Sequence, residues 1–203
     1  QANVPVMIDF GANRPERPMA ELVTKKLRPG DIYTHAYSGL RDELLDSGKV
    51  NPGMWEGRKR GVIFDVGHGG GSFDYTIAEA AIPQGCPPDT ISSDIHVVSG
   101  NTPGMPYLPW VMSKFMGLGF TLEQVIAMAT INPAKIINRA PKLGTLQVGA
   151  PGDVAIMELV EGPVSFVDTR NNKRDGRAYL KPVQTVTGGV PFGRPYSLPF
   201  AVR

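Results

Sequence analysis

The sequence predicts an α/β fold that ends in a small antiparallel β module, and two observations carry this prediction. Short β-rich runs in the first half alternate with helical segments and recur after about 26–33 residues, which leaves room for the crossover of about a dozen residues that parallel strands require. From Leu143 onward, frequent glycines punctuate short β-type runs, a pattern typical of antiparallel strands joined by tight turns.

Each of the four expected strands ends in a polar or glycine-rich turn, and the runs are Val4–Phe10, Ile32–Tyr37, Val62–Val66 and Thr90–Val97. Apolar residues at helical spacing predict one helix over Pro18–Leu27 and a second over Phe73–Ala81. Residues 39–60 are less regular, although the spacing of Leu40, Leu44 and Leu45 indicates at least a short helix.

Two further helices are expected after the fourth run. Thr121–Gln124 fits a capping box, and Asn132-Pro133 starts the next helix with proline at its first position. We place a domain boundary near Arg139, so that residues 1–139 form the α/β part and residues 140–203 form the β module.

Composition excludes several classes of protein. The 203 residues can bury a sizeable core, and 24 glycines with 19 prolines stay below the share that indicates disorder. The net charge is +2 and no basic block is denser than Arg58–Arg60, so we expect no nucleic-acid partner. No apolar run approaches the roughly 18–20 residues of a bilayer span, so we expect no membrane partner.

Because the chain begins at Gln1, we expect that a leader has been removed or that the sequence is a fragment.

The chemically active side chains lie at the carboxyl ends of the expected strands. All three histidines, His35, His68 and His96, occur there, together with Asp9 and Asp94. In a barrel of parallel strands this edge carries the catalytic residues. Imidazole and carboxylate groups on neighbouring strands can share a divalent metal, which activates water near neutral pH. Each residue alone also fits a structural role, but together they predict a metal-dependent hydrolytic site.

Asp94 is the candidate for proton transfer, because a carboxylate beside metal-bound water can take its proton and return it to the leaving group. In an extended strand Asp94 and His96 share one face, so we expect His96 to hold substrate or to orient Asp94. The run Gly67–Ser72 either receives an oxyanion through backbone N–H groups or forms a flexible turn. It also echoes the oxyanion loop of serine esterases, but the Gly-x-Ser-x-Gly elbow of that class does not occur in the sequence.

Five motifs follow one another in a fixed order through nearly the whole chain: Gly30–His35, Gly61–Phe73, Ile91–His96, Ser113–Phe115, and Thr130–Ala134 through Leu143–Val154. Together they resemble the amidohydrolase superfamily, specifically its dihydroorotase-like amidohydrolase and deacetylase branch. The resemblance implies the second half, strands 5–8, of a (β/α)8 TIM-type barrel, followed by part of a small C-terminal β-sandwich.

The resemblance also implies roles for particular residues. His35 and Asp94 correspond to metal ligands, and Asp94 to the catalytic proton carrier. His68, Gly69 and His96 would lie on the substrate side. The family usually has a histidine after strand 5, where this chain has Asp9, which we expect to be a metal ligand although a carboxylate is a harder donor.

A second departure from the family concerns completeness. The His-x-His pair of strand 1 and the bridging lysine of strand 4 have no counterpart, and residues 1–139 are far fewer than the roughly 200–250 of a barrel enzyme. We therefore expect the missing barrel half to come from the same or another chain, and the assembly to be a homo-oligomer.

The implied activity is that of a metal-dependent hydrolase, deacetylase-like, which cleaves an amide or ester bond of a small-molecule substrate through metal-activated hydroxide. The implied cofactor is a divalent metal, zinc first, with one or two ions in the complete enzyme. Two alternatives stay open: a cyclic amide hydrolase of dihydroorotase or hydantoinase type, and a non-catalytic fragment that lacks the strand 1 and strand 4 ligands. Arg14 or Arg17 are candidates to hold a substrate carboxylate. The sequence leaves the compartment open and favours cytoplasmic over exported.

Overall fold

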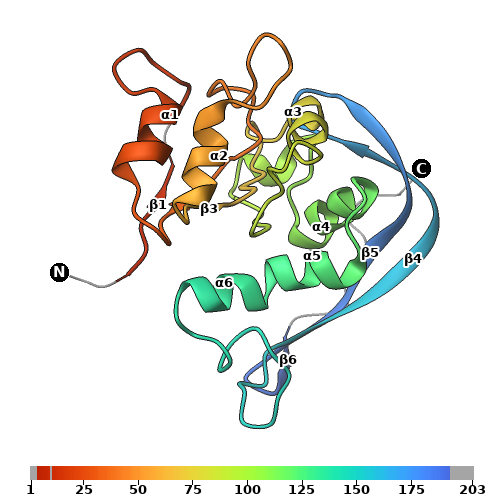
Figure 1. Cartoon of the computed structure of the whole chain (residues 1–203). Coiled ribbons are helices and arrows are strands. Elements are labelled where there is room, and N and C mark those ends of the chain that lie inside the picture. The colour runs from red at the N-terminus through yellow and green to blue at the C-terminus, as the bar shows by residue number, and fades with distance from the viewer. Residues whose placement is uncertain (1–3, 10, 193–203) are drawn as a thin grey trace. The chain divides into compact units, whose positions relative to one another are not determined.

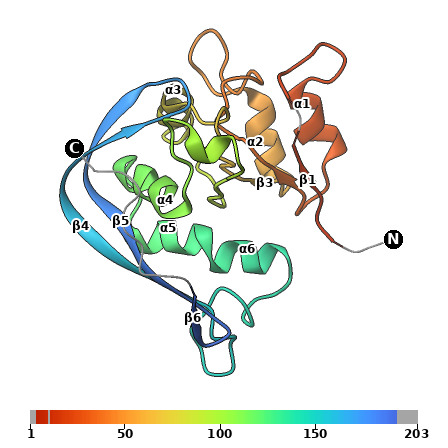
Figure 2. The ribbon, with the colours of Figure 1, turned by 180° about the vertical axis from the view of Figure 1, so that it is seen from behind.

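A computed structural model of the chain describes residues 4–9 and 11–192 (Figures 1 and 2). It separates into two compact units. The first holds the described residues of Gln1–Pro106 together with Val167–Asn172, and the second holds Tyr107–Phe166 and the described residues from Lys173 onward. Residue 139 falls inside the second unit, so the division into 1–139 and 140–203 stays a prediction from the sequence.

The first unit is built on a parallel sheet, as the alternating pattern predicts. Its strands are β1 (Met7–Ile8), β2 (Ile32–Tyr33) and β3 (Ile63–Phe64), arranged in the order β1-β2-β3. Both strand pairs are parallel. The strands are shorter than the predicted runs because the backbone soon leaves the extended conformation, as at His35 with a φ of 58°. Phe10, the end of the first predicted run, lies outside the described residues.

The fourth predicted strand, Thr90–Val97, is not a regular strand in this structure. Its first residues run beside the segment that follows β3, and the carbonyl of Ser93 accepts a hydrogen bond from the N–H of Gly69 (3.0 Å). Asp94 then has a φ of 46°, which ends the extended conformation. The expectation that Asp94 and His96 share one strand face is therefore wrong, because alternation of faces requires an extended backbone.

Three helical segments accompany the sheet: α1 (Met19–Glu21), which continues as the π-helical turn η1 (Leu22–Lys26), α2 (Pro52–Lys59) and α3 (Tyr75–Ala81). They confirm the helices predicted over 18–27 and 73–81. Met19, Val23 and Met54 are buried on the inner faces of α1, η1 and α2. Both ribbon views show α1 and α2 side by side along the sheet (Figures 1 and 2).

The short helix expected within residues 39–60 is present as α2, but the leucines of residues 40–45 that suggested it lie outside this helix. Leu44 instead pairs with Val50 in an isolated antiparallel bridge. The helix begins only at Pro52, after the side chain of Asn51 accepts a hydrogen bond from the N–H of Gly53 (2.9 Å). Proline at the first position suits a helix start because that N–H has no partner within the helix.

The second unit combines helices α4 (Leu108–Gly117), α5 (Leu122–Ala129) and α6 (Ile131–Ile136) with strands β4 (Val154–Val167), β5 (Lys173–Thr187) and β6 (Val190–Phe192). Its sheet has the order β4-β5-β6, and β5 pairs antiparallel with β6, which confirms antiparallel pairing in the module. Within this unit α4 packs on β5, and both ribbon views show β4 and β5 as one long curved ribbon (Figures 1 and 2).

Helix starts in the second unit follow the sequence closely. The capping box is confirmed, since Thr121 and Gln124 exchange side-chain to backbone hydrogen bonds at the start of α5. Helix α6 begins at Ile131, so Pro133 occupies its third position and not its first. That position is tolerated because the first four N–H groups of a helix lack partners within it. No helix within residues 4–9 and 11–192 is long and apolar enough to span a bilayer.

Glycines inside β4 and β5 do not end these strands, contrary to the short runs that the sequence predicts. Gly176 lies within β5, and a Cβ there would lie 2.6 Å from Cε2 of Phe166, a buried ring. This glycine therefore allows an aromatic ring to approach the backbone closely, which a turn assignment from composition misses.

Candidate functional site

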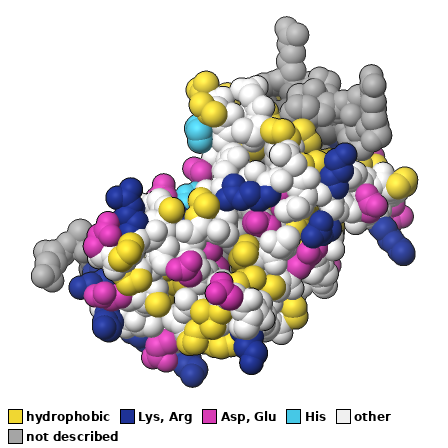
Figure 3. All heavy atoms as spheres, turned by 90° about the horizontal axis from the view of Figure 1, so that it is seen from above, with side chains coloured by type: hydrophobic (Ala, Val, Ile, Leu, Met, Phe, Trp, Pro, Cys, Tyr) yellow, Lys and Arg dark blue, Asp and Glu magenta, His cyan; other side chains and the backbone are white. Residues whose placement is uncertain are grey.

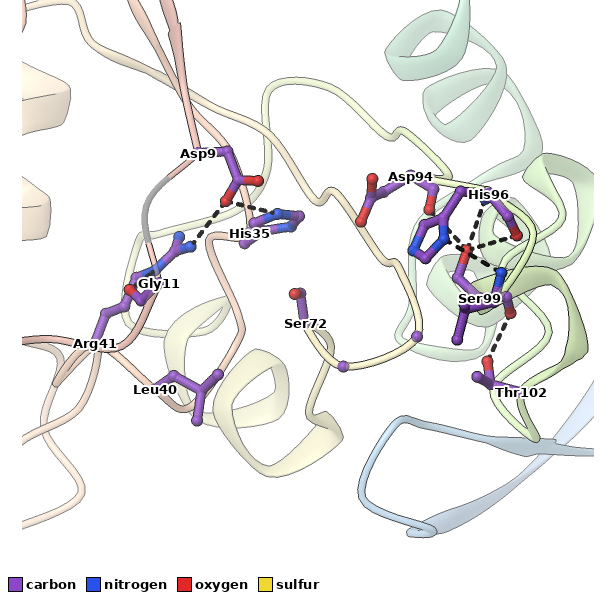
Figure 4. Close-up of a pocket in the computed structure, with 13 residues that line it drawn as sticks. Asp9, Gly11, His35, Leu40, Arg41, Ser72, Asp94, His96, Ser99 and Thr102 are labelled. Atoms are coloured by element: carbon purple, nitrogen blue, oxygen red, sulfur yellow. Dashed lines mark hydrogen bonds and ion pairs between the residues drawn. The ribbon is translucent and has the colours of Figure 1, made fainter.

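A cavity of about 400 Å³ opens in the first unit, beside the carboxyl ends of β1 and β2. Asp9, His35, Asp94 and His96 all line it, so the structure brings together four of the residues singled out from the sequence. Figure 4 shows Asp9 with His35 on one wall and Asp94 with His96 across the cavity from them. Seen from above, histidine and acidic side chains reach the surface close together (Figure 3).

His35 is held in one orientation. It follows β2 directly and is only 6% exposed, and its Nδ1 lies 2.6 Å from the carbonyl oxygen of Gly67. Because a carbonyl oxygen can only accept, Nδ1 must carry the proton of this hydrogen bond. Nε2 then faces Asp9 Oδ1 at 3.2 Å. This separation fits an ion pair between Asp9 and a protonated imidazole, and it also fits two donors that share one metal cation.

Asp9 is also engaged by a buried guanidinium. Its Oδ1 lies 3.6 Å from an Nη of Arg41, whose side chain is 3% exposed. Arg41 further donates to the carbonyl of Thr34 (2.8 Å) and lies over the ring of Tyr33, whose phenol pKa is raised by burial. Arg41 therefore lies within ion-pair distance of Asp9 and offsets part of its negative charge.

Asp94, unlike His35, is exposed and is not held by hydrogen bonds to its side chain from the described residues. Its backbone is left-handed, with a φ of 46°, and its side chain is exposed. Within the described part of the chain no group donates a hydrogen bond to its carboxylate, which is therefore available to a ligand. Gly69 lies directly beneath it, since a Cβ at that glycine would be 2.5 Å from Asp94 Oδ2.

The turn after Asp94 is tied by a buried serine. Ser99 begins the 3-10 turn η2 (Ser99–Asn101), and its hydroxyl lies 3.0 Å from the carbonyl oxygen of Asp94 and 2.8 Å from the N–H of His96. The His96 ring itself is exposed beside the cavity. Ser99 thus fixes the backbone that presents Asp94 and His96.

His68 and Gly69 do not line the cavity. His68 is fully buried, stacks on Phe73 with ring centroids 4.8 Å apart, and places Nδ1 2.8 Å from the carbonyl of Gly69. The N–H of Gly69 is used by Ser93. Their substrate roles remain predictions from the resemblance, and it is the following residues, Gly70–Ser72, that face the cavity.

Sequence reasoning missed several residues of the site. Arg41 and Ser99 carry no local pattern that marks them, because their roles arise from contacts with other segments. Arg14 and Arg17, the arginines considered from the sequence, do not line the cavity. Asp65 does not line the cavity, but its buried carboxylate accepts hydrogen bonds from Thr34 and Ser92. It had a visible signal in the sequence, since it is an acidic residue between apolar neighbours in an expected strand.

The donor groups fit a divalent cation in kind but not in number. Imidazole and carboxylate oxygens are ligands that zinc accepts, and His35 has the backbone-bonded ring nitrogen common in metal-ligating histidines. Among the described residues, however, no three His, Cys, Asp or Glu side chains lie close enough to enclose a metal ion by themselves. A complete metal centre at this cavity needs further ligands.

Residues 74–190 match the sequence model described as the amidohydrolase family. A protein named deacetylase from Enterococcus faecalis is 27% identical over 188 residues, which are 92% of this chain and 50% of that protein. A protein named deacetylase from Brucella anthropi is 33% identical over 193 residues, 91% of this chain and 45% of that protein. The chain therefore spans about half the length of the curated relatives it matches.

Solved structures show the same relationship. The crystal structure of an adenine deaminase superposes with a TM-score of 0.84 and 28% identity, over 93% of this chain and 50% of that one. The crystal structure of a dihydroorotase gives a TM-score of 0.77 and 28% identity, over 98% of this chain and 51% of that one.

Proposed function

Because this chain belongs to the amidohydrolase family, we propose that it forms the carboxyl-terminal half of a metal-dependent hydrolase barrel, completed by residues outside this sequence. The observation that carries the proposal is the convergence of Asp9, His35 and Asp94 on one cavity at the carboxyl ends of the parallel strands. The exposure of apolar residues on and beside β1, where Met7 is 54% exposed, supports a further strand at this edge.

The residues that line the cavity have different roles in the proposed reaction. His35 and Asp9 would hold one divalent cation, zinc first, and Asp94 would hold a second across the cavity, with the remaining ligands of both supplied by the other barrel half. When bound, the cation supplies Lewis acidity that polarises the scissile carbonyl and makes water nucleophilic at neutral pH. Asp94 accepts the proton of the attacking water on a carboxylate oxygen and passes it to the leaving nitrogen or oxygen. Arg41 offsets part of the negative charge of Asp9 throughout.

The reaction class we propose is hydrolysis of an amide or ester that releases an acyl group from a small molecule. Two relatives named deacetylase support this class. A second candidate is ring opening of a cyclic amide, which the similarity to a dihydroorotase structure favours. The similarity to an adenine deaminase structure adds hydrolytic deamination as a reaction to be tested.

The first experiment joins mass, metal content and turnover. The full-length protein is purified without chelator, and its mass and metal content are measured. It is then assayed against N-acetylated amino acids, acetyl esters, dihydroorotate and adenine. We expect an assembly larger than this 21.9 kDa chain, one or two zinc ions per complete site, and deacetylation that a chelator removes and added zinc restores.

Two results would contradict the proposal. Turnover that survives complete removal of metal would exclude metal dependence. A metal-loaded, folded protein that hydrolyses none of these substrates would favour the non-catalytic alternative. Ring opening without deacetylation would instead select the second candidate.

A further inference from the structure

Asp65 is a buried carboxylate that takes no part in the mechanism above, yet it contacts the chain segments on both walls of the cavity. We propose that Asp65 is a positioning residue, which holds the segments carrying His35 and Asp94 at the separation that the reaction needs. The inference rests on the proposed function, because it gives these two residues their roles.

Three hydroxyl groups converge on this carboxylate. Asp65 directly follows β3 and is 1% exposed. Its Oδ2 accepts hydrogen bonds from the hydroxyls of Thr34 and Ser92, and its Oδ1 accepts one from Thr90, each at 2.6 Å. The carboxylate therefore bonds to Thr34, which directly follows β2, on one side and to the Thr90–Ser92 segment on the other.

Each side leads directly to a candidate site residue. Thr34 is the neighbour of His35, and Ser92 lies two residues before Asp94. The hydroxyl of Ser92 also accepts the N–H of Gly67 (3.2 Å), so its own hydrogen is directed toward Asp65. The carbonyl of the same Gly67 accepts the Nδ1 hydrogen of His35. Residues 65 and 67 thus connect the two walls through a continuous set of hydrogen bonds.

A carboxylate buried at this position costs folding free energy, and that cost has a purpose when the group orients other side chains. Burying it requires several hydrogen bonds to replace its hydration, whereas the adjacent buried residues Phe64 and Val66 are apolar. An apolar residue would fill the space but could not direct three hydroxyl groups. Partners of this kind fix the orientation of the groups that act on a metal or substrate, and their loss costs metal affinity or rate.

The test removes one hydroxyl at a time from the full-length protein. Thr34→Val acts on the His35 side and Ser92→Ala on the Asp94 side, and each leaves Asp65 with two hydrogen bonds. The matched controls are Thr24→Val and Ser113→Ala. The hydroxyl of Thr24 donates to the carbonyl of Ala20 and that of Ser113 to the carbonyl of Pro109, and neither residue lines the cavity.

Three quantities are measured for each variant: the dissociation constant for Co²⁺ from its absorption spectrum, kcat and KM for an N-acetylated amino acid, and the thermal midpoint. We expect Thr34→Val to weaken Co²⁺ binding about 10–100-fold relative to Thr24→Val. We expect Ser92→Ala to lower kcat up to about 100-fold with little change in KM, because misplacement of Asp94 affects the chemical step. The controls should change only the thermal midpoint.

The outcomes separate this inference from the proposed function. If Thr34→Val and Ser92→Ala lower the thermal midpoint but match their controls in Co²⁺ affinity and kcat, Asp65 is purely structural and the inference is wrong. If the unmodified protein hydrolyses nothing, the proposed function fails by itself. The Co²⁺ arm then still decides, since weaker binding by Thr34→Val than by Thr24→Val supports positioning and equal binding overturns it.

Discussion

Two aspartates of the first unit, Asp31 and Asp94, have opposite environments. At the amino end of β2, Asp31 is 3% exposed and accepts hydrogen bonds from the N–H groups of Val6 and Arg28 and from the Arg28 guanidinium. Asp94, which lines the cavity, is exposed and accepts none from the described residues. A carboxylate whose acceptor sites are all filled stabilises the fold, whereas one with open sites can bind a ligand or a proton. This division agrees with barrel enzymes, where the carboxyl end of the strands carries the chemistry.

Replacing Asp94 should cause the largest loss of kcat with little change in the free energy of unfolding. Asn tolerates a left-handed backbone, so Asp94→Asn should keep the turn while losing the proton acceptor. We expect kcat to fall about 10³-fold while the free energy of unfolding changes by less than about 0.5 kcal/mol. Steady-state kinetics, metal analysis and urea unfolding measure the effect, and Asp46→Asn, at an exposed position away from the cavity, is the control. Retained turnover would remove Asp94 from the mechanism.

A smaller effect on rate is expected from Gly69→Ala. The new methyl group would lie 2.5 Å from Asp94 Oδ2, and the φ of 51° at Gly69 is one that alanine rarely adopts. We expect kcat to fall about 10–100-fold and the protein to lose about 1–3 kcal/mol of stability. Gly30→Ala is the matched control, because its φ of 86° gives comparable strain with no atom within 4 Å of the new methyl group. Equal loss of kcat in both variants would mean that backbone strain alone lowers activity.

The smallest effect is expected from Asp31→Asn, at the amino end of the sheet. The Arg28 guanidinium holds the pKa of the Asp31 carboxyl well below its usual range. Since the pKa is lower in the folded than in the unfolded state, the stabilisation is complete above a pH of about 4 and is lost as the pH falls further. We expect Asp31→Asn to lower the free energy of unfolding by about 1 kcal/mol at neutral pH, and to reduce its decline in acid, with kcat unchanged.

Urea unfolding between neutral pH and about pH 3 checks this expectation. The exposed Asp46→Asn again serves as the control. An acid decline as steep in Asp31→Asn as in the unmodified protein would show that other carboxylates cause it. A fall in kcat would show that the two ends of the sheet are not functionally separate.

The positions of the candidate site residues along the chain were predictable because they depend on local order. Asp9 and His35 follow short β-rich runs, and a parallel sheet brings the ends of such runs to one edge. The capping box at Thr121 was predictable for the same reason, since its hydrogen bonds join residues three apart. The resemblance to the amidohydrolase superfamily was also predictable from the order of motifs, and residues 74–190 match the model of that family.

Which side chains face the cavity was decided by contacts between distant segments. His68 occurs at a strand end in the sequence, yet it is buried against Phe73. Arg41 belongs to no motif, and it contacts Asp9 although it lies 32 positions later in the chain.

The sequence by itself determined the alternating α/β order, the chemical types gathered at the strand ends and the family. Only the tertiary structure decided that Asp94 turns left-handed beside Gly69, and that Asp65 bonds to both walls of the cavity. The physical reason is that propensity and spacing act over a few residues. The direction of a side chain, by contrast, depends on backbone angles and hydrogen bonds set by segments about 30 residues away.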